Sequence, residues 1–326
     1  MRNKPPILGI DLLGGNQYSF EYVLATLQCL YTIEAPFQLV LFVEHDIIFD
    51  LKKELKFLQR TSDKQCDLFA VKEVIHMHDH PLHVVRKKKD SSMCLGIRLL
   101  KKKKINALIS TGNTGALIAA AKMQLSMIKN ISTLALMALL PTKRELVAVI
   151  DVGANIYCTS QQLMQFAQMG VAYQKSRGIK TPSIGLLNIG REKRKGREEF
   201  KETYKRLLNC PEFVGNVEGK EVFSGDVHVL VADGFAGNIF LKTSEGIASF
   251  ILDIVSHSSK HLLKKLETHL YPIECCGAIV CGVDEMIMKC HANSTPEIVK
   301  HSVQRAIHLV QHSFIEKIQH YSVWTL

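Results

Sequence analysis

Glycine and asparagine gather at the ends of several apolar segments of the chain. Five segments end in such turns, and residues 214–219 have a similar composition; the five turns are residues 11–16, 110–115, 151–155, 188–190 and 233–238. Glycine lets the backbone approach a ligand closely, and the N–H groups at a helix N-terminus bind anions. One such turn is common in any α/β protein, but five together predict a site for a phosphate or a carboxylate.

Several other chemistries lack their motifs. The sequence contains neither G-x-G-x-x-G, the dinucleotide fingerprint, nor G-x-x-x-x-G-K-[ST], the nucleotide triphosphate motif. G-x-S-x-G is also absent, and no cysteine has a recognisable activating context. These absences disfavour a kinase, a conventional dehydrogenase and a covalent protein nucleophile. The bound anion can itself be the nucleophile.

A metal centre is not expected. The histidine-rich segment 76–83 has enough ligands by number, but it contains Pro81 and lacks Cys or acidic residues at structural zinc spacing. Cys275, Cys276 and Cys281 lack the paired C-x-x-C spacing and are interpreted as packing residues. We therefore predict neither a metal nor an organic cofactor.

The segments that precede the turns have the pattern of strands in a parallel sheet. Unbroken apolar runs are typical of strands buried on both faces; they occur at residues 7–10, 38–43, 68–71, 107–109, 146–150, 184–189 and 227–232. Helical patterns lie between them, for example over residues 161–175. The alternation predicts a doubly wound α/β fold with a mostly parallel sheet and helices on both faces. Since ligands bind at the carboxyl ends of parallel strands, the turns should converge on one crevice.

Size and charge set further limits. The 326 residues are 47% apolar, and the chain has a net charge of +10. We expect a single large α/β unit over residues 1–326 with a small helical projection near residues 250–275. Basic residues concentrate in 86–104 and 191–206, which suggests an acidic partner or a phosphate-bearing substrate, although solvated helix faces would look the same. No apolar segment is long enough to span a membrane, the N-terminus is wrong for a signal peptide, and the nine scattered cysteines suit the cytoplasm.

Seven segments together resemble one enzyme family, the bacterial phosphate acyltransferases of phospholipid synthesis known as PlsX. They keep the family's order from about residue 8 to about residue 310 and are residues 9–15, 86–93, 109–117, 151–155, 186–190, 213–219 and 233–238. The resemblance implies a fold similar to isocitrate and isopropylmalate dehydrogenases and to phosphotransacetylase. It implies transfer of a fatty acyl group from acyl carrier protein to inorganic phosphate, which gives acyl phosphate. It also implies a homodimer at the membrane surface that supplies a membrane-bound glycerol-3-phosphate acyltransferase.

This chemistry suits the residues of the turns, because phosphate must be positioned and an oxyanion stabilised. For contact with the reactants we expect Gly112, Asn113, Thr114, Gly115, Asn155, Asn188, Asn216, Glu218 and Asn238. For charge stabilisation and proton handling we expect Lys195, Lys242, Asp151, Asp233 and His291. For the acidic carrier protein we expect Arg86, Lys87, Lys88 and Lys89. Each of these residues could instead be an ordinary turn, core or surface residue.

The chain departs from the family pattern at identifiable positions. Asn16 stands where the family usually has an acid, Tyr157 where it has Asp, and Arg191 where it has Thr. Residues 274–278 and 291–294 also differ from the family's Tyr-Gly-Gly-Ala and His-Gly-Ser-Ser. The last third of the site is therefore the least constrained by the resemblance.

Two other function classes stay open. A phosphotransacetylase-like enzyme that uses acyl-CoA would share the fold and the chemistry. A nucleic-acid-binding module would exploit the basic segments, but aromatic residues are only 7% and do not interleave with the lysines, so we expect no nucleic acid partner. A further helical pattern at 258–271 places Leu262, Leu263, Leu266 and Leu270 beside lysines, which suits either a membrane interface or a packed helix.

Overall fold

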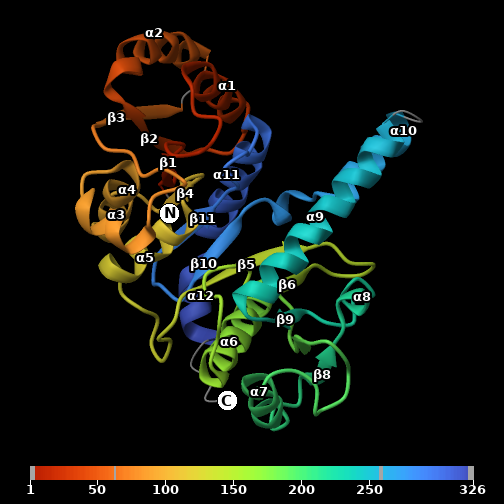
Figure 1. Cartoon of the computed structure of the whole chain (residues 1–326). Helices are drawn as coiled ribbons and strands as arrows, with labels where there is room; N and C mark the ends of the chain where they lie inside the picture. The colour runs from red at the N-terminus through yellow and green to blue at the C-terminus, as the bar shows by residue number, and fades with distance from the viewer. Residues whose placement is uncertain (1–3, 62–63, 257–259, 322–326) are drawn as a thin grey trace. The chain divides into compact units, whose positions relative to one another are not determined.

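The computed structural model describes residues 4–61, 64–256 and 260–321 (Figure 1). The chain forms two compact units. Unit 1 comprises residues 1–127 and 283–315, and unit 2 comprises residues 128–282 and 316–326. Each unit has its own strands and helices and is described separately.

Unit 1 contains a parallel sheet with the strand order β3-β2-β1-β4-β11. Its strands are β1 (Ile7–Asp11), β2 (Gln38–Glu44), β3 (Gln65–Val71), β4 (Ala107–Ser110) and β11 (Met286–Lys289). Its helices are α1 (Phe20–Tyr31), α2 (Ile48–Leu58), α3 (Pro81–Lys87), α4 (Ser92–Lys101), α5 (Thr114–Gln124) and α11 (Pro296–Gln311). Short 3₁₀ turns at His45–Ile47 and Gln59–Thr61 flank α2. Because every strand pair is parallel, the carboxyl ends of all five strands lie at one edge.

Unit 2 has the strand order β10-β5-β6-β9-β7-β8. Its strands are β5 (Ala135–Leu140), β6 (Val147–Ile150), β7 (Ile184–Leu187), β8 (Phe213–Val217), β9 (Val229–Val231) and β10 (Ala278–Cys281). Its helices are α6 (Ser160–Ser176), α7 (Glu198–Leu207), α8 (Gly219–Val222), α9 (Gly234–Ser256) and α10 (Lys260–Leu270), with a 3₁₀ turn at Ile273–Cys275. Strands β6, β9, β7 and β8 pair in parallel, whereas β5 pairs antiparallel with β6 and with β10. The last helix, α12 (Phe314–Tyr321), runs across the boundary of the two units in sequence.

Local sequence explains where the helices begin. Ser19, Ser91, Asn113, Thr159 and Thr295 each cap a helix by accepting a hydrogen bond from a backbone N–H of its first turn. The cap of α6 is a full capping box, which Gln162 completes. The helix predicted over residues 161–175 is confirmed as α6.

The predicted fold class is confirmed, with additions. All seven apolar runs form strands, and four more strands are present that the apolar runs did not indicate, namely β5, β8, β10 and β11. Helices pack against the strands of each sheet; α4, for example, packs on β1, β2 and β4, and α11 packs on β4 and β11. In the described part of the chain, no helix is both long enough and apolar enough to cross a membrane.

Helices α9 and α10 form a hairpin-like pair in unit 2 (Figure 1). Only Gly234, Gly237 and Leu241 of α9 are buried, and no described residue of α10 is. Leu263, Leu266 and Leu270 are half-buried, whereas Leu262 is exposed. The first residues of the helical pattern predicted at 258–271 lie outside the described residues. The rest of that pattern is α10, and most of its leucines are partly covered.

Candidate functional site

The carboxyl ends of β1, β4 and β11 meet in unit 1 because β4 pairs with both neighbours. The Ser110 hydroxyl donates a hydrogen bond to a carboxylate oxygen of Asp11 (2.9 Å), and Thr111 Oγ1 donates to the carbonyl of Leu12 (3.1 Å). The turn after β1 is equally tight. A Cβ on Gly14, whose φ is +78°, would lie 2.1 Å from the carbonyl oxygen of Ile75. Only glycine fits this position.

Helix α5 begins inside this cluster, and Asn113 builds its N-terminus. Asn113 Oδ1 accepts the N–H of Ala116 (3.0 Å), and the Asn113 carbonyl accepts the N–H of Leu117. The N–H groups of Thr114 and Gly115 lie in the first turn of α5, where no helical carbonyl accepts them. Thr114 is half-buried and Gly115 is exposed, so these donors lie near the surface. They form the most suitable anion contact in unit 1.

The amide nitrogen of Asn113 braces a neighbouring turn. It lies 3.3, 3.0 and 3.2 Å from the carbonyl oxygens of His76, Met77 and Asp79. The side chain of Asn113 is therefore committed to the protein, and a bound anion would meet the backbone of this turn rather than the amide.

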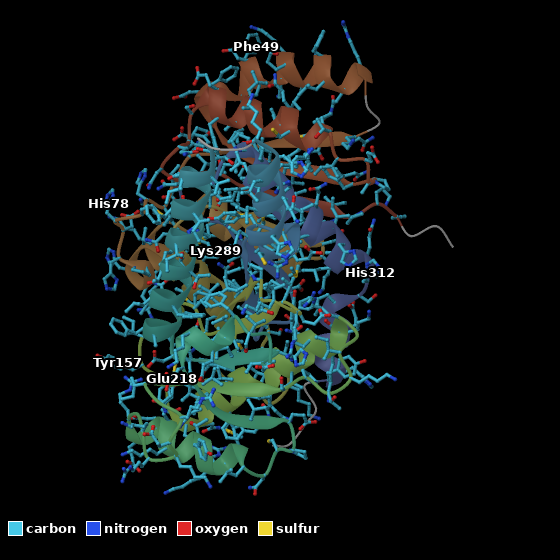
Figure 2. All side chains as sticks on the ribbon, turned by 90° about the vertical axis from the view of Figure 1, so that its right-hand side faces the viewer. Phe49, His78, Tyr157, Glu218, Lys289 and His312 are labelled. Carbon is cyan, nitrogen blue, oxygen red and sulfur yellow. The ribbon has the colours of Figure 1, made fainter. Side chains whose placement is uncertain are left out.

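Two buried charged groups lie behind the turn. Asp11 is fully buried, and its Oδ1 has no hydrogen-bond partner among the described residues. Burial raises the pKa of Asp11 to about 6, although hydrogen bonds from Ser92 and Ser110 and the charge of Lys289 oppose the rise. Lys289 Nζ, also buried, donates to the carbonyl oxygens of Thr111 (3.3 Å) and Cys290 (Figure 2). Sequence reasoning missed Lys289, because its only local signal is its position at the end of a short apolar run.

The departures from the family pattern in unit 1 contact one another. Asn16 Nδ2 donates to Asn293 Oδ1 (2.8 Å), and the Asn16 backbone N–H donates to the Ala292 carbonyl (3.0 Å). The change after the first Gly-Gly and the change after β11 are thus compatible with each other. His291 is exposed in the same turn, where its carbonyl accepts the N–H of Ser294 (3.0 Å).

In unit 2, the fully buried carboxylate of Asp151 organises the turn after β6. It accepts hydrogen bonds from the backbone N–H groups of Leu136 (2.9 Å), Gly153 (3.1 Å), Ala154 (3.0 Å) and Asn155 (2.7 Å), and from Asn155 Nδ2 (2.9 Å). Burial raises the pKa of Asp151, and the N–H groups of Ala154 and Leu136 oppose this rise. With five donors around it, the carboxylate holds the shape of the turn.

The turn after β9 is fixed against the turn after β6. The N–H of Gly234 donates to the Asn155 carbonyl (2.8 Å), and a Cβ on Gly237 would lie 1.9 Å from the Asp151 carbonyl oxygen. Asn238 is exposed. Its side chain would lie 3.7 Å, an ordinary van der Waals distance, from a Cβ placed on Gly153. Asp151, Asn155 and Asn238 therefore lie close together.

An arginine that sequence reasoning missed joins this group. Arg197 pairs with one carboxylate oxygen of Asp233, whose other oxygen accepts the N–H of Ala236 (2.8 Å). The guanidinium carbon of Arg197 also lies 5.4 Å from the ring centres of Tyr157 and Phe200. Tyr157, one of the departures from the family pattern, thus has a cationic partner. Neighbouring charges in the basic segment 191–206 obscured Arg197 in the sequence.

Asparagines also brace the turn after β7. Asn188 Nδ2 donates to the Lys195 carbonyl (3.0 Å) and to Asn216 Oδ1 (3.2 Å), and Asn216 Nδ2 donates to the Glu192 carbonyl (3.0 Å). The methylene chain of Lys195 lies 3.4 Å from where a Cβ on Gly190 would be. No described residue forms an ion pair with Lys195, so its ammonium group can meet an anion.

Glu218 and Lys242 are held in local ion pairs. Glu218 caps α8 and pairs with Lys220 (2.9 Å), and Lys242 pairs with Glu245 one turn further along α9 (3.1 Å). In the view of Figure 2, Glu218 and Tyr157 lie at the same side of unit 2. Glu218 directly follows Val217, whose carbonyl accepts the N–H of Asn188 (3.0 Å), so it lies beside the turn after β7, whereas Lys242 is on the surface of α9.

The basic segment proposed for a protein partner lies at the end of α3 in unit 1. Arg86, Lys87 and Lys89 are exposed. Lys88 is different, because its ammonium donates to the Val74 carbonyl (2.7 Å) and pairs with Asp79 (2.9 Å). Three of the four basic residues are thus available at the surface.

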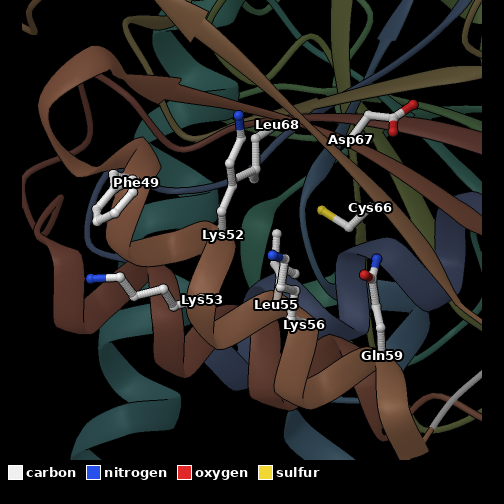
Figure 3. Close-up of a pocket in the computed structure, with 9 residues that line it drawn as sticks. All are labelled: Phe49, Lys52, Lys53, Leu55, Lys56, Gln59, Cys66, Asp67 and Leu68. Atoms are coloured by element: carbon white, nitrogen blue, oxygen red, sulfur yellow. The ribbon is translucent and has the colours of Figure 1, made fainter.

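A shallow groove of about 570 Å³ lies elsewhere in unit 1, beside α2 and β3 (Figure 3). It is lined by Phe49, Lys52, Lys53, Leu55, Lys56, Gln59, Cys66, Asp67 and Leu68. None of the candidate residues lines it, and β3 contributes only residues before its carboxyl end. The groove is therefore not the site that the turns predict.

Comparison with known proteins identifies relatives over almost the whole chain. The family described as "Fatty acid synthesis protein" matches residues 7–317. Phosphate acyltransferase from Chlamydia pneumoniae is 35% identical over 317 residues, which cover 95% of this chain and 97% of the relative. Phosphate acyltransferase from Dictyoglomus turgidum is 34% identical, with 95% of this chain and 96% of the relative covered.

Solved structures with a similar fold are more distant in sequence. A phosphotransacetylase from Streptococcus pyogenes superposes with a TM-score of 0.61 at 16% identity, covering 96% of this chain and 95% of that chain. A branched-chain phosphotransacylase from Enterococcus faecalis V583 gives a TM-score of 0.57 at 15% identity, covering 94% and 99%. At these identities the likeness concerns the fold, and the predicted similarity to phosphotransacetylase is confirmed at that level.

Proposed function

Because the chain belongs to the fatty acid synthesis protein family and is an acyltransferase that acts on phosphate, we propose that its acyl donor is a fatty acyl group on acyl carrier protein. A phosphate oxygen attacks the thioester carbon and the carbon–sulfur bond breaks. The carrier thiolate leaves and takes up a proton, and acyl phosphate remains. A membrane-bound glycerol-3-phosphate acyltransferase would consume this product.

The N-terminus of α5 supports the phosphate side of the proposed reaction. Asn113 fixes the turn, and Thr114 and Gly115 present N–H groups that no helical carbonyl accepts. Gly112 continues the same backbone, and its own N–H donates to Ser110 Oγ (3.2 Å). Such a turn holds phosphate through the backbone and orients one oxygen for attack.

Unit 2, taken by itself, offers its own groups for contact with an anionic reactant. Lys195 is the cation that we propose for this contact, and Asn238 is an exposed amide at the start of α9. Asp151, Asn155, Asn188 and Asn216 hold the turns that carry these groups, through the hydrogen bonds described above. Asp233 is assigned the same positioning role through Arg197.

The exposed basic residues Arg86, Lys87 and Lys89 are the proposed docking site for the acidic carrier protein. Charges at the rim of an interface act mainly on association rate and salt dependence. Lys88 contributes by holding the segment, since its ion pair with Asp79 ties α3 to the turn that Asn113 also braces.

We also propose a homodimer that contacts the membrane surface from the cytoplasm. Phe250 and Ile254 of α9 are large apolar residues that are exposed in the single chain, and they suit a surface covered by a second copy. On α10, exposed Leu262 lies near Lys264 and Lys265, an arrangement that suits an anionic membrane interface. Cosedimentation with anionic vesicles should fall for Leu262→Glu while the dimer persists, and unchanged cosedimentation would place the contact elsewhere.

Thiol release tests the proposed donor. We expect phosphate-dependent release of free thiol from acyl carrier protein loaded with a palmitoyl group, and much slower release from palmitoyl-CoA. A preference for the CoA thioester would instead establish the phosphotransacetylase-like alternative. Thiol release that does not depend on phosphate would contradict both.

A further inference from the structure

Three exposed isoleucines each directly follow a candidate asparagine in unit 2. They are Ile156, Ile189 and Ile239, which follow Asn155, Asn188 and Asn238. Their exposed fractions are 63%, 81% and 51%. Isoleucine is among the residues most often found fully buried, so three exposed ones in equivalent places require an explanation.

The three isoleucines follow the carboxyl ends of three neighbouring strands of the unit 2 sheet. Asn155 and Ile156 belong to the turn after β6, Asn188 and Ile189 to the turn after β7, and Ile239 to the start of α9 after β9. Strand β9 pairs in parallel with both β6 and β7, so the three turns leave the sheet at the same end. Adjacent strands are only about 4.8 Å apart, which keeps neighbouring turns within the length of a side chain.

Polar and apolar side chains separate in two of these turns. The amide of Asn155 donates inward to the Leu134 carbonyl (2.7 Å), and that of Asn188 donates inward to the Lys195 carbonyl (3.0 Å). The isoleucine that follows each asparagine is left at the surface. Tyr157 and Phe235, also exposed, extend the apolar edge beside the same turns. The edge therefore offers an apolar surface directly next to a polar centre.

We propose that this apolar edge, formed by Ile156, Ile189 and Ile239 with Tyr157 and Phe235, binds the hydrocarbon chain of the acyl donor. The inference rests on the proposed function, in which the thioester carbon reacts beside the polar residues. The chain is bonded to that carbon, so it must leave the polar centre across whatever surface adjoins it. Each isoleucine directly follows a candidate asparagine in the sequence.

The dependence on chain length tests this subsite. The probes are acyl carrier protein loaded with butyryl, octanoyl or palmitoyl groups, at saturating phosphate. Ile189→Ser should lower the ratio of kcat/KM for palmitoyl over butyryl about tenfold, because the contact it removes exists only for the longer chain. Ile189→Leu should restore the ratio. The matched control is Leu208→Ser, which changes a comparably exposed residue that follows α7 (54%) and should leave the ratio unchanged.

Other results would overturn the assignment. An unchanged ratio, or an equal loss for all three chain lengths, would show that Ile189 does not contact the chain. Dissociation of a wild-type dimer by Ile189→Ser would assign the edge to a second copy, and reduced vesicle binding with an unchanged ratio would assign it to a membrane. If wild-type protein transfers no acyl group from any probe, the proposed donor fails together with the subsite. An active wild type with an unchanged ratio removes the subsite alone.

Discussion

Replacing Asn113 by aspartate separates two roles that this one side chain combines. Its oxygen caps α5 by accepting the N–H of Ala116, and its nitrogen faces three carbonyl oxygens of the turn at residues 76–79. Aspartate keeps the capping oxygen. Its second carboxylate oxygen, however, would face those three carbonyl oxygens with no proton to offer them.

The magnitude follows from the two roles. Aspartate and asparagine are about equally good N-caps, each worth about 1 kcal/mol over alanine. Loss of the amide donor leaves three partly buried carbonyl oxygens without this partner, which costs at most about 1–3 kcal/mol. Asn113→Ser, which retains a cap, should therefore lose about 1–3 kcal/mol in the free energy of unfolding, and Asn113→Ala about 2–4 kcal/mol. Asn113→Asp should lose at least as much as the serine variant, because it adds repulsion.

Urea denaturation of the three variants measures these differences. An aspartate variant as stable as wild type would refute the bracing role, since capping alone predicts no loss. Phosphate saturation gives an independent readout. The added negative charge beside the N–H groups of Thr114 and Gly115 should raise the KM for phosphate more than serine does. An equal KM in both variants would remove this turn from the phosphate site.

Three further predictions concern charge and packing. Burial raises the pKa of Asp11 from 3.8 to about 6, above its unfolded value, so the fold favours the protonated form and wild type should lose up to about 3 kcal/mol as the pH rises through this range. Asp11→Asn should lack this loss in urea midpoints measured across that range, and a parallel pH profile would contradict the assignment. Joint replacement of Lys87 and Lys89 by Glu should raise the KM for acyl carrier protein and flatten its salt dependence. An equal loss with a small thioester would instead indicate misfolding. Gly237→Ala should destabilise unit 2 by about 3 kcal/mol, because the new Cβ would lie 1.9 Å from the Asp151 carbonyl oxygen, and an unchanged urea midpoint would contradict this packing.

Two of the strands that sequence analysis missed, β5 and β8, lack a clean apolar run with a turn at its end. Strand β5 lies within the longer apolar stretch 131–140, where nothing marks its ends. Strand β8 contains Gly215 at a φ of +106° and Asn216, and the register shifts beside it, so its sequence resembles a turn. Strands β10 and β11 have four residues each, as the predicted strand β4 has, so their length does not explain why they were missed. The parallel pairing of β11 with β4 in unit 1 identifies it as a strand, which its local sequence does not.

The candidate site shows the same division between local and distant information. Turns such as 110–115 and 151–155 could be predicted because a strand end followed by Gly and Asn is a local signal. Lys289 and Arg197 could not, because their roles come from partners distant in sequence. Lys289 lies 178 residues from Thr111, and Arg197 lies 36 residues from Asp233. Arg197 lies among other charged residues and Lys289 ends an apolar run, and neither position reveals the distant partner.

The asparagines of the site do not all act on a ligand in the same way. Asn113, Asn155, Asn188 and Asn216 each donate to a main-chain carbonyl of the protein. Their amides therefore fix the turns, and what a turn can offer an anion is its backbone N–H groups, which the glycines leave accessible. Asn238 differs, because its side chain is exposed and has no hydrogen-bond partner among the described residues. The same residue type thus fixes turns at four positions, and at the fifth its amide is exposed at the surface.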